Sequence, residues 1–365
     1  MIGGTPVWSH RRGRPPKPLE RSHFLEAAWE LVRAAAGDDG GTDPALVAVD
    51  RRLTADVYWK AVREVVPVSE VRTRLESVGA WFRWSGSERG LVGAAAAVAW
   101  PGSHPTWELI SYRERARWGT ARTVDPRSVR AVQRKFPHLF LCFDGRTRRL
   151  LVAPHTPCPI LFGLRSTDPD SPGRALSGVR SEPVERWLTF RTNQGTGDHL
   201  VPRTASDWEE LTSGVLRGRV ATTPAVLRGG HVRFDLNTRS NEPIPCVAFE
   251  PTKTLPEVAR TLVPGDAVRV WGSRAPEGSI HLEGIEVVRW NPYRTRPAAP
   301  PCPTCRRPAH SVGAGRGFRC RKCGRRFPPE AARRVPRPPP LSARVYHPTP
   351  SARRHLAPRG PENSD

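Results

Sequence analysis

The sequence lacks the features that would place a protein in a membrane or an oxidising compartment. Its longest apolar run, residues 90–100, has eleven residues, whereas a membrane-spanning helix needs about 20. The N-terminal arginines are followed by no apolar segment, so we expect no signal peptide. Four of the seven cysteines lie in two close pairs, which favours a metal site over a disulfide framework. We therefore expect a cytoplasmic protein.

Acidic residues and lysine are scarce relative to arginine. The 365 residues contain 58 Lys and Arg against 35 Asp and Glu, a formal charge of +23, and only five of the basic residues are lysine. A GC-rich genome could produce this arginine bias. However, residues 294–365 carry 17 basic and three acidic side chains, against ten and eight in residues 214–292. The uneven placement favours an electrostatic role, and nucleic acid is the first partner to consider.

Hydrophobic periodicity divides the N-terminal half into two regions. Residues 19–36, 55–66 and 69–78 have helical spacing, and Ser69 is expected to cap the third helix. Beyond residue 80, helices alternate with hydrophobic strands, among them strands predicted at 139–143 and 149–154. Asp125-Pro126 is expected to begin one helix by N-cap and first-turn proline. The alternation over residues 91–205 predicts a ferredoxin-like α/β sandwich within a multidomain α+β protein.

Residues 210–292 have the pattern of an all-β domain. Five strands are predicted at 214–220, 231–237, 245–249, 267–272 and 280–288, with a helix between the third and the fourth. This order predicts an OB-fold β-barrel, a fold that binds oligonucleotides.

The face of this barrel supplies candidate RNA contacts. We expect phosphate or stacking contacts from Arg217, Arg219, His231, Arg233 and Lys253. Trp271 is a further stacking candidate, whereas strand alternation places Phe234 in the core.

The strongest chemical signal is two Cys-x2-Cys pairs separated by fourteen residues. Each pair forms a knuckle that directs both thiolates to one ion, so the spacing predicts a zinc ribbon over residues 298–328 with structural Zn²⁺. The expected metal ligands are Cys302, Cys305, Cys320 and Cys323. We expect Arg316, Arg319 and Lys322 of this ribbon to contact RNA, with a solvated protein-interaction ribbon as the alternative.

The remaining cysteines and the C-terminus are less informative. Cys142, Cys158 and Cys246 are solitary and are expected to be ordinary buried thiols. Residues 329–365 are rich in Arg and Pro, which predicts a disordered basic tail. Such a tail is either a solvated extension or a non-specific attractor of phosphate.

Several segments together form a pattern of high joint specificity. They are residues 160–165 (ILFGLR), 183–200 (PVERWLTFRTNQGTGDHL), 229–253 (GGHVRFDLN…CVAFEPTK) and the cysteine pairs with Ser311-Val312-Gly313. These segments resemble the archaeal tRNA(Ile2) 2-agmatinylcytidine synthetase family, in the family's order. Residues 90–97 (GLVGAAAA) and 106–113 (TWELISYR) resemble the middle region of that family, and weaker similarity extends back to Thr42-Asp43-Pro44 and Pro6-Val7-Trp8.

The resemblance implies a reaction and its components. Enzymes of this family use ATP to activate the C2 carbonyl of the wobble cytidine in the CAU anticodon of isoleucine tRNA, and agmatine then displaces the activated oxygen. A kinase-like domain, here partial and spanning residues 1–90, would do the chemistry with ATP and Mg²⁺, while the OB-fold and zinc ribbon hold the tRNA. The motifs imply substrate contacts at Arg165, Arg191, Thr192, Asn193 and Gln194.

One family feature has no match in this sequence. The family opens with an acidic Asp-Asp-Thr-Asp-type segment, whereas Asp38-Asp39 follows a helix here and Asp168-Pro169-Asp170 lies in the sandwich. Catalytic residues are therefore unassigned. We expect the chain to begin within the kinase-like domain, through a late gene-model start or a true truncation. A non-catalytic tRNA-binding protein and a single-stranded DNA-binding protein remain alternatives.

Overall fold

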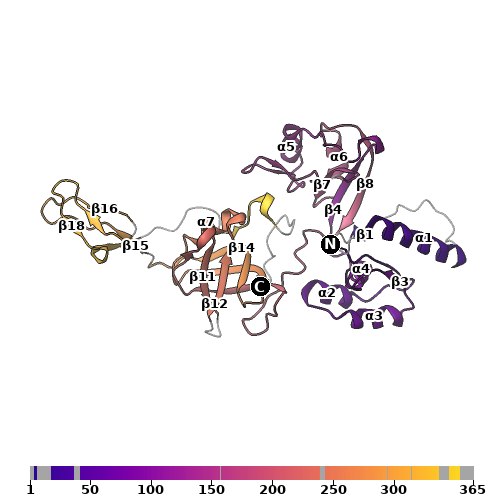
Figure 1. The fold of residues 1–365 in the computed structure, drawn as a ribbon, viewed down its shortest axis with the longest axis horizontal. Coiled ribbons are helices and arrows are strands. Elements are labelled where there is room, and N and C mark those ends of the chain that lie inside the picture. The colour runs from indigo at the N-terminus through magenta and orange to yellow at the C-terminus, as the bar shows by residue number, and fades with distance from the viewer. Residues whose placement is uncertain are drawn as a thin grey trace.

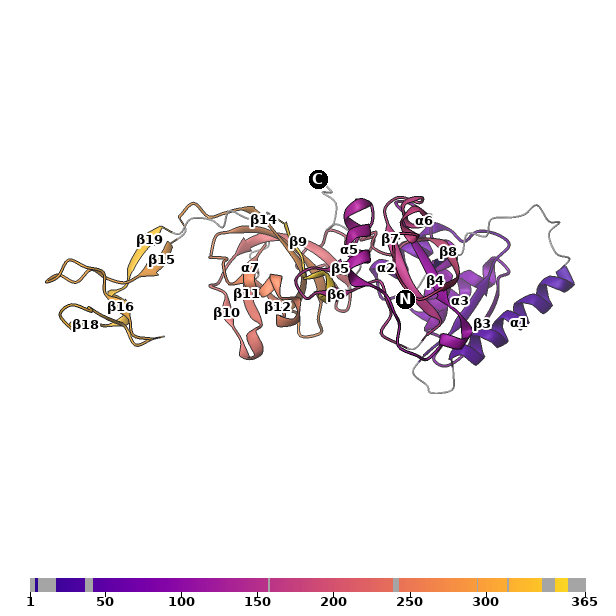
Figure 2. The same cartoon turned by 90° about the horizontal axis from the view of Figure 1, so that it is seen from above.

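The computed structural model describes residues 4–5, 18–36, 42–156, 158–238, 243–293, 295–313, 315–336 and 345–353. Asp38 and Asp39 lie outside these ranges. In both views the barrel lies between the ribbon at one end and two N-terminal units at the other (Figures 1 and 2). No described helix is long and apolar enough to cross a membrane.

The N-terminal unit packs helices against a two-stranded antiparallel sheet. Its elements are α1 (Pro18–Ala36), β2 (Ala45–Ala48), α2 (Ala55–Arg63), α3 (Val68–Ser77), β3 (Trp81–Trp84) and α4 (Gly90–Ala99). Small residues let α4 approach its neighbours closely: a Cβ at Gly90 would lie 2.0 Å from the backbone oxygen of Asp43. Leu75 and Leu91 are fully buried in the core of this unit.

Packing differs from the sequence analysis at two places in this unit. Helix α4 shares one core with α2, α3 and β2, whereas the sequence analysis assigns it to the ferredoxin-like domain. Helix α3 begins at Val68, and its N-cap is Pro67 rather than the predicted Ser69. Pro67 has extended backbone with a ψ of 137°, and the N–H that proline lacks has no partner ahead of the first helical turn, so Pro67 is well suited to precede the helix.

The sandwich is a four-stranded antiparallel sheet whose order is β1-β8-β4-β7. Helices α5 and α6 share a core with one face of it. Asp125 caps α5 as predicted, accepting a hydrogen bond from the Arg127 amide. The elements are β1 (Gly4–Thr5), β4 (Thr106–Arg113), η1 (Arg115–Arg117), α5 (Pro126–Lys135), β5 (Phe143–Asp144), β6 (Arg149–Leu150), β7 (Ile160–Ser166), α6 (Ser171–Leu176) and β8 (Val184–Thr192).

A short hairpin replaces two longer predicted strands in the sandwich. Strands were expected at 139–143 and 149–154, but only β5 and β6 pair with each other. Residues 139–142 are kept out of the strand because Leu141 has left-handed backbone with a φ of 51° and the Cys142 amide donates to Gln133 Oε1. After Phe143, Asp144 Oδ1 accepts hydrogen bonds from the Arg146 and Thr147 amides at 2.9 and 3.2 Å. This side-chain turn ends the strand.

The barrel closes with the topology of an OB-fold. Its strands are β9 (Ser213–Val220), β11 (Val232–Asn237), β12 (Pro243–Ala248), β13 (Ala267–Arg274) and β14 (Ile280–Arg289). Neighbours follow β9-β11-β12-β14-β13-β9, and only the β12–β14 pairing is parallel. Helix α7 (Thr254–Ala259) lies between β12 and β13 in the chain. The OB-fold prediction is confirmed, as is the core position of Phe234, which is 1% exposed.

The ribbon is connected to the barrel by a two-stranded antiparallel ladder of β15 (Thr295–Ala298) and β19 (Arg333–Pro336). The ribbon itself is a three-stranded antiparallel sheet. Its strands are β16 (His310–Ser311), β17 (Phe318–Arg319) and β18 (Arg326–Phe327).

Residues 345–353, which we call the C-terminal strap, join the barrel to the sandwich. Strand β20 (Val345–Tyr346) pairs with β14, and His347 packs edge-on against Trp271 with ring centroids 5.4 Å apart. The Ser351 amide, in η5 (Pro350–Ala352), then donates to Asp144 Oδ2 at 3.0 Å. The prediction of a disordered tail is therefore wrong for residues 333–336 and 345–353. Strand pairing and buried contacts offset the conformational entropy that these residues lose on ordering.

The strap depends on the charge of Asp144, which is fully buried. Burial raises the pKa of this carboxyl group, but hydrogen bonds from Ser351 and Thr147 outweigh it and hold the pKa well below its ordinary value. Its contribution to stability is therefore complete above about pH 4 and is lost as the pH falls further.

We predict that Asp144→Asn loosens the strap, because an amide nitrogen cannot accept the Ser351 hydrogen bond. The free energy of unfolding should fall by about 1–3 kcal/mol, and hydrogen exchange of the strap amides should accelerate. The matched control is Glu257→Gln, which weakens a different polar contact between the sandwich and the barrel, the Arg146–Glu257 pair, which is about half exposed. Equal strap exchange in both variants would contradict the prediction.

Candidate functional site

The two cysteine knuckles of the ribbon have the same backbone geometry. In the first, the Arg306 amide donates to the Cys302 carbonyl at 2.7 Å; in the second, the Gly324 amide donates to the Cys320 carbonyl at 2.9 Å. Arg306 and Gly324 both have left-handed backbone, with φ of 51° and 76°. The repeated turn directs both thiols of each pair toward the same point.

The four thiols fit a zinc ion. Their Sγ atoms all lie within 4.8 Å of one another, and the Cys302–Cys323 Sγ distance is 3.6 Å. Zn–S bonds of about 2.3 Å in a tetrahedron place sulfurs about 3.8 Å apart. Within the described ranges these cysteines are the one group of three or more His, Cys, Asp and Glu side chains that could hold a metal. Four thiolates fill a tetrahedral shell, so such an ion is structural.

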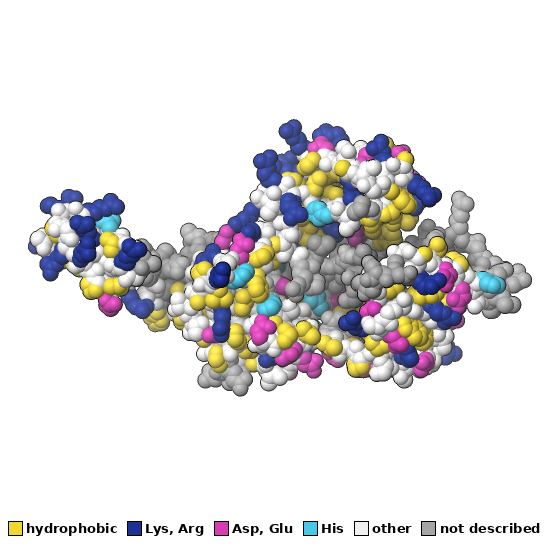
Figure 3. All heavy atoms as spheres, viewed as in Figure 1, with side chains coloured by type: hydrophobic (Ala, Val, Ile, Leu, Met, Phe, Trp, Pro, Cys, Tyr) yellow, Lys and Arg dark blue, Asp and Glu magenta, His cyan; other side chains and the backbone are white. Residues whose placement is uncertain are grey.

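The ribbon surface is strongly cationic. Figure 3 shows dark blue side chains gathered over it. Eight of its cations are exposed, and none has a carboxylate partner among the residues that the structure describes. They are Arg306, Arg307, Arg316, Arg319, Arg321, Lys322, Arg325 and Arg326. The set includes all three ribbon residues predicted to contact RNA.

The predicted RNA contacts of the barrel are partly neutralised. Arg217 and Arg219 are exposed on β9. Arg233 forms an ion pair with Asp235 at 3.6 Å, and Lys253 pairs with Glu250. His231 accepts a hydrogen bond from the Glu250 amide through Nδ1 at 2.9 Å. The barrel therefore offers less unpaired positive charge than the sequence indicated.

The prediction that Trp271 stacks on bases is wrong, and a better candidate, Phe249, was not predicted. Trp271 is 3% exposed, because its ring lies over Gly284, where a Cβ would come within 1.9 Å of the indole, and under His347 of the strap. Phe249 is instead only half-buried and contacts His231 and His281 edge-on, with centroids 5.2 and 4.7 Å apart. Strand alternation alone could not reveal it, because Phe249 follows the end of β12.

A polar cluster joins the sandwich to the N-terminal unit. Tyr58 of α2 is 1% exposed and donates a hydrogen bond to Asp198 Oδ2 at 2.6 Å. Asn193 Nδ2 donates to the Tyr58 hydroxyl at 3.3 Å, and Arg63 Nε donates to the Asp198 carbonyl at 3.2 Å. Burial, followed by the hydrogen bond to Asp198, raises the pKa of Tyr58 above its ordinary value. Sequence analysis did not single out Tyr58.

Residues 191–194 lie beside this cluster. The Arg191 guanidinium lies 5.3 Å from the Trp100 ring centroid and donates to the Gly102 carbonyl. Thr192 is buried, and its Oγ1 accepts a hydrogen bond from the Gln194 amide at 2.9 Å. The structure thus brings four of the five predicted substrate residues together at the junction of two units.

Arg165 lies apart from the other four. It is on β7, on the opposite side of β4 from β8, and pairs across the strands with Glu108 at 3.1 Å. A Cβ at Gly163 would lie 2.9 Å from Glu108 Oε1, so glycine makes room for this carboxylate. The side chains of Arg165 and Glu108 are 15% and 12% exposed.

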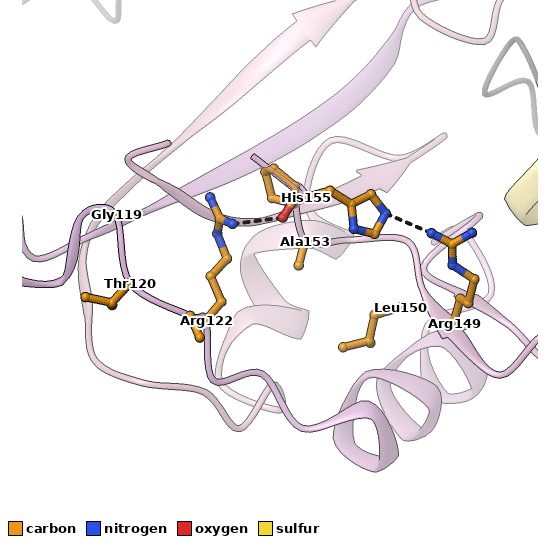
Figure 4. A pocket seen from close by; sticks show the side chains of 9 residues that line it. Gly119, Thr120, Arg122, Arg149, Leu150, Ala153 and His155 are labelled. Carbon is orange, nitrogen blue, oxygen red and sulfur yellow. Dashed lines mark hydrogen bonds between the residues drawn. The ribbon is translucent and has the colours of Figure 1, made fainter. Parts of the chain in front are cut away.

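A pocket of about 500 Å³ opens elsewhere in the sandwich. Arg122 lies on one side of it, and Arg149 and His155 lie on the other, 3.1 Å apart (Figure 4). Arg122 donates to the carbonyls of Pro154, Thr156, Cys158 and Ile160, which makes it a support of the surrounding loop. The pocket contains none of the predicted substrate residues.

Two of the three solitary cysteines are confirmed as ordinary buried thiols. Cys142 and Cys246 are buried, and burial raises the pKa of the Cys142 thiol to about 12. Cys158 is half-buried, and its Sγ lies 3.2 Å from an Arg122 nitrogen.

An OB barrel beside a cationic four-cysteine ribbon defines a multidomain nucleic acid-binding protein. A family model described as the TiaS FLD domain matches residues 88–199, and one described as the TiaS C-terminal zinc ribbon domain matches residues 299–338. The tRNA(Ile2) 2-agmatinylcytidine synthetase TiaS of Archaeoglobus fulgidus is 35% identical over 332 residues, 90% of this chain and 78% of that protein. Its counterpart in Methanosarcina mazei is 37% identical over 82% of this chain and 70% of its own. The chain belongs to the tRNA(Ile2) 2-agmatinylcytidine synthetase (TiaS) family.

Solved structures are similar across most of the chain. Apo TiaS, a tRNAIle2 agmatidine synthetase, is 34% identical with a TM-score of 0.75, covering 93% of this chain and 81% of that one. A TiaS–tRNA(Ile2)–AMPCPP–agmatine complex is 32% identical with a TM-score of 0.76, covering 92% and 81%. The fold class and family predicted from the sequence are confirmed.

We predict that Cys302→Ser abolishes zinc binding and unfolds the ribbon, because a ribbon this small has no sufficient core without its metal. Zinc content measured by elemental analysis should fall from one ion per chain to none, while the melting of the barrel is unchanged. Cys158→Ser is the control and should keep its zinc. A folded, metal-free ribbon would contradict the assignment.

We predict that Tyr58→Phe weakens the junction between the N-terminal unit and the sandwich. Asp198 Oδ2 and Asn193 Nδ2 both lose a partner, which should lower the free energy of unfolding by about 1–3 kcal/mol. Chemical denaturation measures the effect. Tyr293→Phe, at a side chain that is 86% exposed, should leave stability unchanged.

Proposed function

We propose that the protein modifies isoleucine tRNA with a CAU anticodon, conjugating agmatine to the wobble cytidine at the expense of ATP. ATP activates the C2 oxygen of the cytidine, the primary amine of agmatine attacks C2, and the activated oxygen leaves. Family membership carries this proposal, since relatives 35% and 37% identical over most of this chain bear that activity in their names. The TiaS complex with tRNA(Ile2), AMPCPP and agmatine, similar over 92% of this chain, supports the same substrates.

We further propose which residues bind the substrates. Four of them lie where the sandwich meets the N-terminal unit, so they border both units. They are Arg191, Thr192, Asn193 and Gln194. Arg165 would act from β7 of the same sheet, where Glu108 balances its charge. Catalytic residues are not assigned.

The RNA would lie along the barrel and ribbon. Arg316, Arg319 and Lys322 are exposed cations without a described carboxylate partner, which suits contact with phosphates. Arg217 and Arg219 on β9 extend this surface. His231, Arg233 and Lys253 lie on the barrel near Phe249, and there RNA would compete with Asp235 and Glu250 for the two cations.

The proposed function also implies cofactors and a role for each domain. Zinc is structural, and we propose that Mg²⁺ accompanies ATP, since Mg²⁺ is usually held by one or two carboxylates together with phosphate oxygens. Residues 1–90 would be the partial kinase-like domain, followed by the sandwich, barrel and ribbon. A cytoplasmic location suits both the tRNA substrate and thiolates that must stay reduced.

The decisive experiment supplies ATP, radiolabelled agmatine and the isoleucine tRNA transcript to the full chain. We expect label in the tRNA only when ATP is present, and none in a transcript whose wobble cytidine is replaced by uridine. Tight, salt-sensitive tRNA binding without label would favour the non-catalytic binder instead. Stronger competition by oligo-dT than by tRNA would favour the single-stranded DNA-binding protein.

A further inference from the structure

Helix α5 carries a stripe of cations on its solvent face. Arg127, Arg130 and Arg134 recur at spacings of three and four residues, opposite the buried Val129 and Val132. All three arginines are exposed, as is Lys135 at the end of the helix. Within the described residues none of these four side chains forms an ion pair with a carboxylate.

This stripe is unlike the charged surface of the N-terminal unit. There, six cations each have a carboxylate within 4.0 Å: the pairs are Arg33–Glu30, Lys60–Glu70, Arg72–Glu88, Arg74–Asp56, Arg83–Glu26 and Arg89–Asp43. Arg51 and Arg52 of that unit are also exposed and have no described carboxylate partner, and Arg52 donates to the Trp100 carbonyl, but these two cations do not form a stripe along one face of a helix. The contrast therefore points to a specific property of α5.

The stripe also works against the stability of the helix. Like charges at spacings of three and four residues repel each other. Arg127 stands in the first turn, where the helix dipole disfavours a positive charge, and that turn contains no acidic residue. Arg134 and Lys135 stand in the last turn, where the dipole favours a positive charge, so the cost falls on Arg127 and on the repulsion within the stripe. A partner that supplies negative charge would remove this cost.

The position of α5 is fixed relative to the barrel. Gln133 Oε1 accepts hydrogen bonds from the Cys142 and Phe143 amides, both at 2.9 Å, which ties α5 to the β5–β6 hairpin. The hairpin contacts the strap through Asp144 and Ser351, and Arg146 pairs with Glu257 of α7. In both views α5 lies on the side of the sandwich that faces the barrel (Figures 1 and 2). Figure 3 shows dark blue side chains both at this corner of the sandwich and on the ribbon, with the barrel between them.

We propose that the exposed face of α5 is a third RNA-binding surface, which contacts phosphates of the tRNA held by the barrel and ribbon. The inference rests on the proposed function, because it takes tRNA as the partner. RNA phosphates supply closely spaced negative charge along the helix, and arginine contacts phosphate without any rearrangement of the fold. The contact is independent of base sequence and positions the RNA against the sandwich.

The test compares the triple variant R127Q/R130Q/R134Q with a matched control, R33Q/R74Q/R83Q, which loses the same charge from paired sites. Binding of isoleucine tRNA to each full-length chain is measured from about 0.05 to 0.2 M salt. We expect the triple variant to bind at least about tenfold more weakly at the lowest salt, and its log–log salt dependence to be shallower by about two to three. The single variant R130Q should lose about one unit of slope, and the control should match the unaltered chain.

Each result decides between the proposals. A triple variant with the slope of the control, and a melting temperature at or above that of the unaltered chain, overturns the role of α5 and leaves the proposed function intact. Failure of the unaltered chain to bind tRNA in the same assay overturns both. If the triple variant misfolds, the slope of R130Q decides alone, because one exposed glutamine is well tolerated in a helix.

Discussion

Buried hydrogen bonds between separately cored units determine how this molecule is arranged. The N-terminal unit, the sandwich and the barrel each have their own hydrophobic core, and thiolates hold the ribbon. The hydrophobic effect is non-directional, so it folds each unit without fixing the angles between units. Those angles depend on Tyr58 with Asp198 at one junction and on Ser351 with Asp144 at the other. One partner of each contact, Tyr58 or Asp144, is fully buried, and a buried polar group that loses its partner is costly.

The units also differ in how many of their cations are paired with carboxylates. The N-terminal unit pairs many of its cations with carboxylates, while the ribbon and α5 keep theirs unpaired in the described chain. Paired surface charges are nearly neutral at a distance, whereas unpaired clusters attract a polyanion through released counterions. Within the described residues, clusters of unpaired cations therefore lie on the ribbon and on α5, and the barrel, whose Arg233 and Lys253 are paired, lies between them.

The segment that carries the family resemblance also serves the architecture. Arg191 covers Trp100 and donates to the Gly102 carbonyl, and Asn193 donates to Tyr58. Residues proposed to bind substrate therefore also hold the sandwich against the N-terminal unit. Such coupling makes the site sensitive to domain position, since a small rotation at the junction moves several of its side chains together. A zinc ion held by the ribbon takes no direct part in this chemistry, because four thiolates leave it no open coordination position.

The sequence by itself determined the modules. Strand alternation and turn positions specified the OB barrel, Asp125-Pro126 specified the start of α5, and the cysteine spacing specified the ribbon, because each signal is local. Tertiary structure decided what depends on distant partners: Trp271 is covered by the strap, α4 packs with the N-terminal helices, Tyr58 meets Asp198, and part of the Arg/Pro-rich tail becomes a strand on β14. Contacts between residues distant in the chain leave no periodicity in the sequence, so only the folded molecule could show which cations stay unpaired.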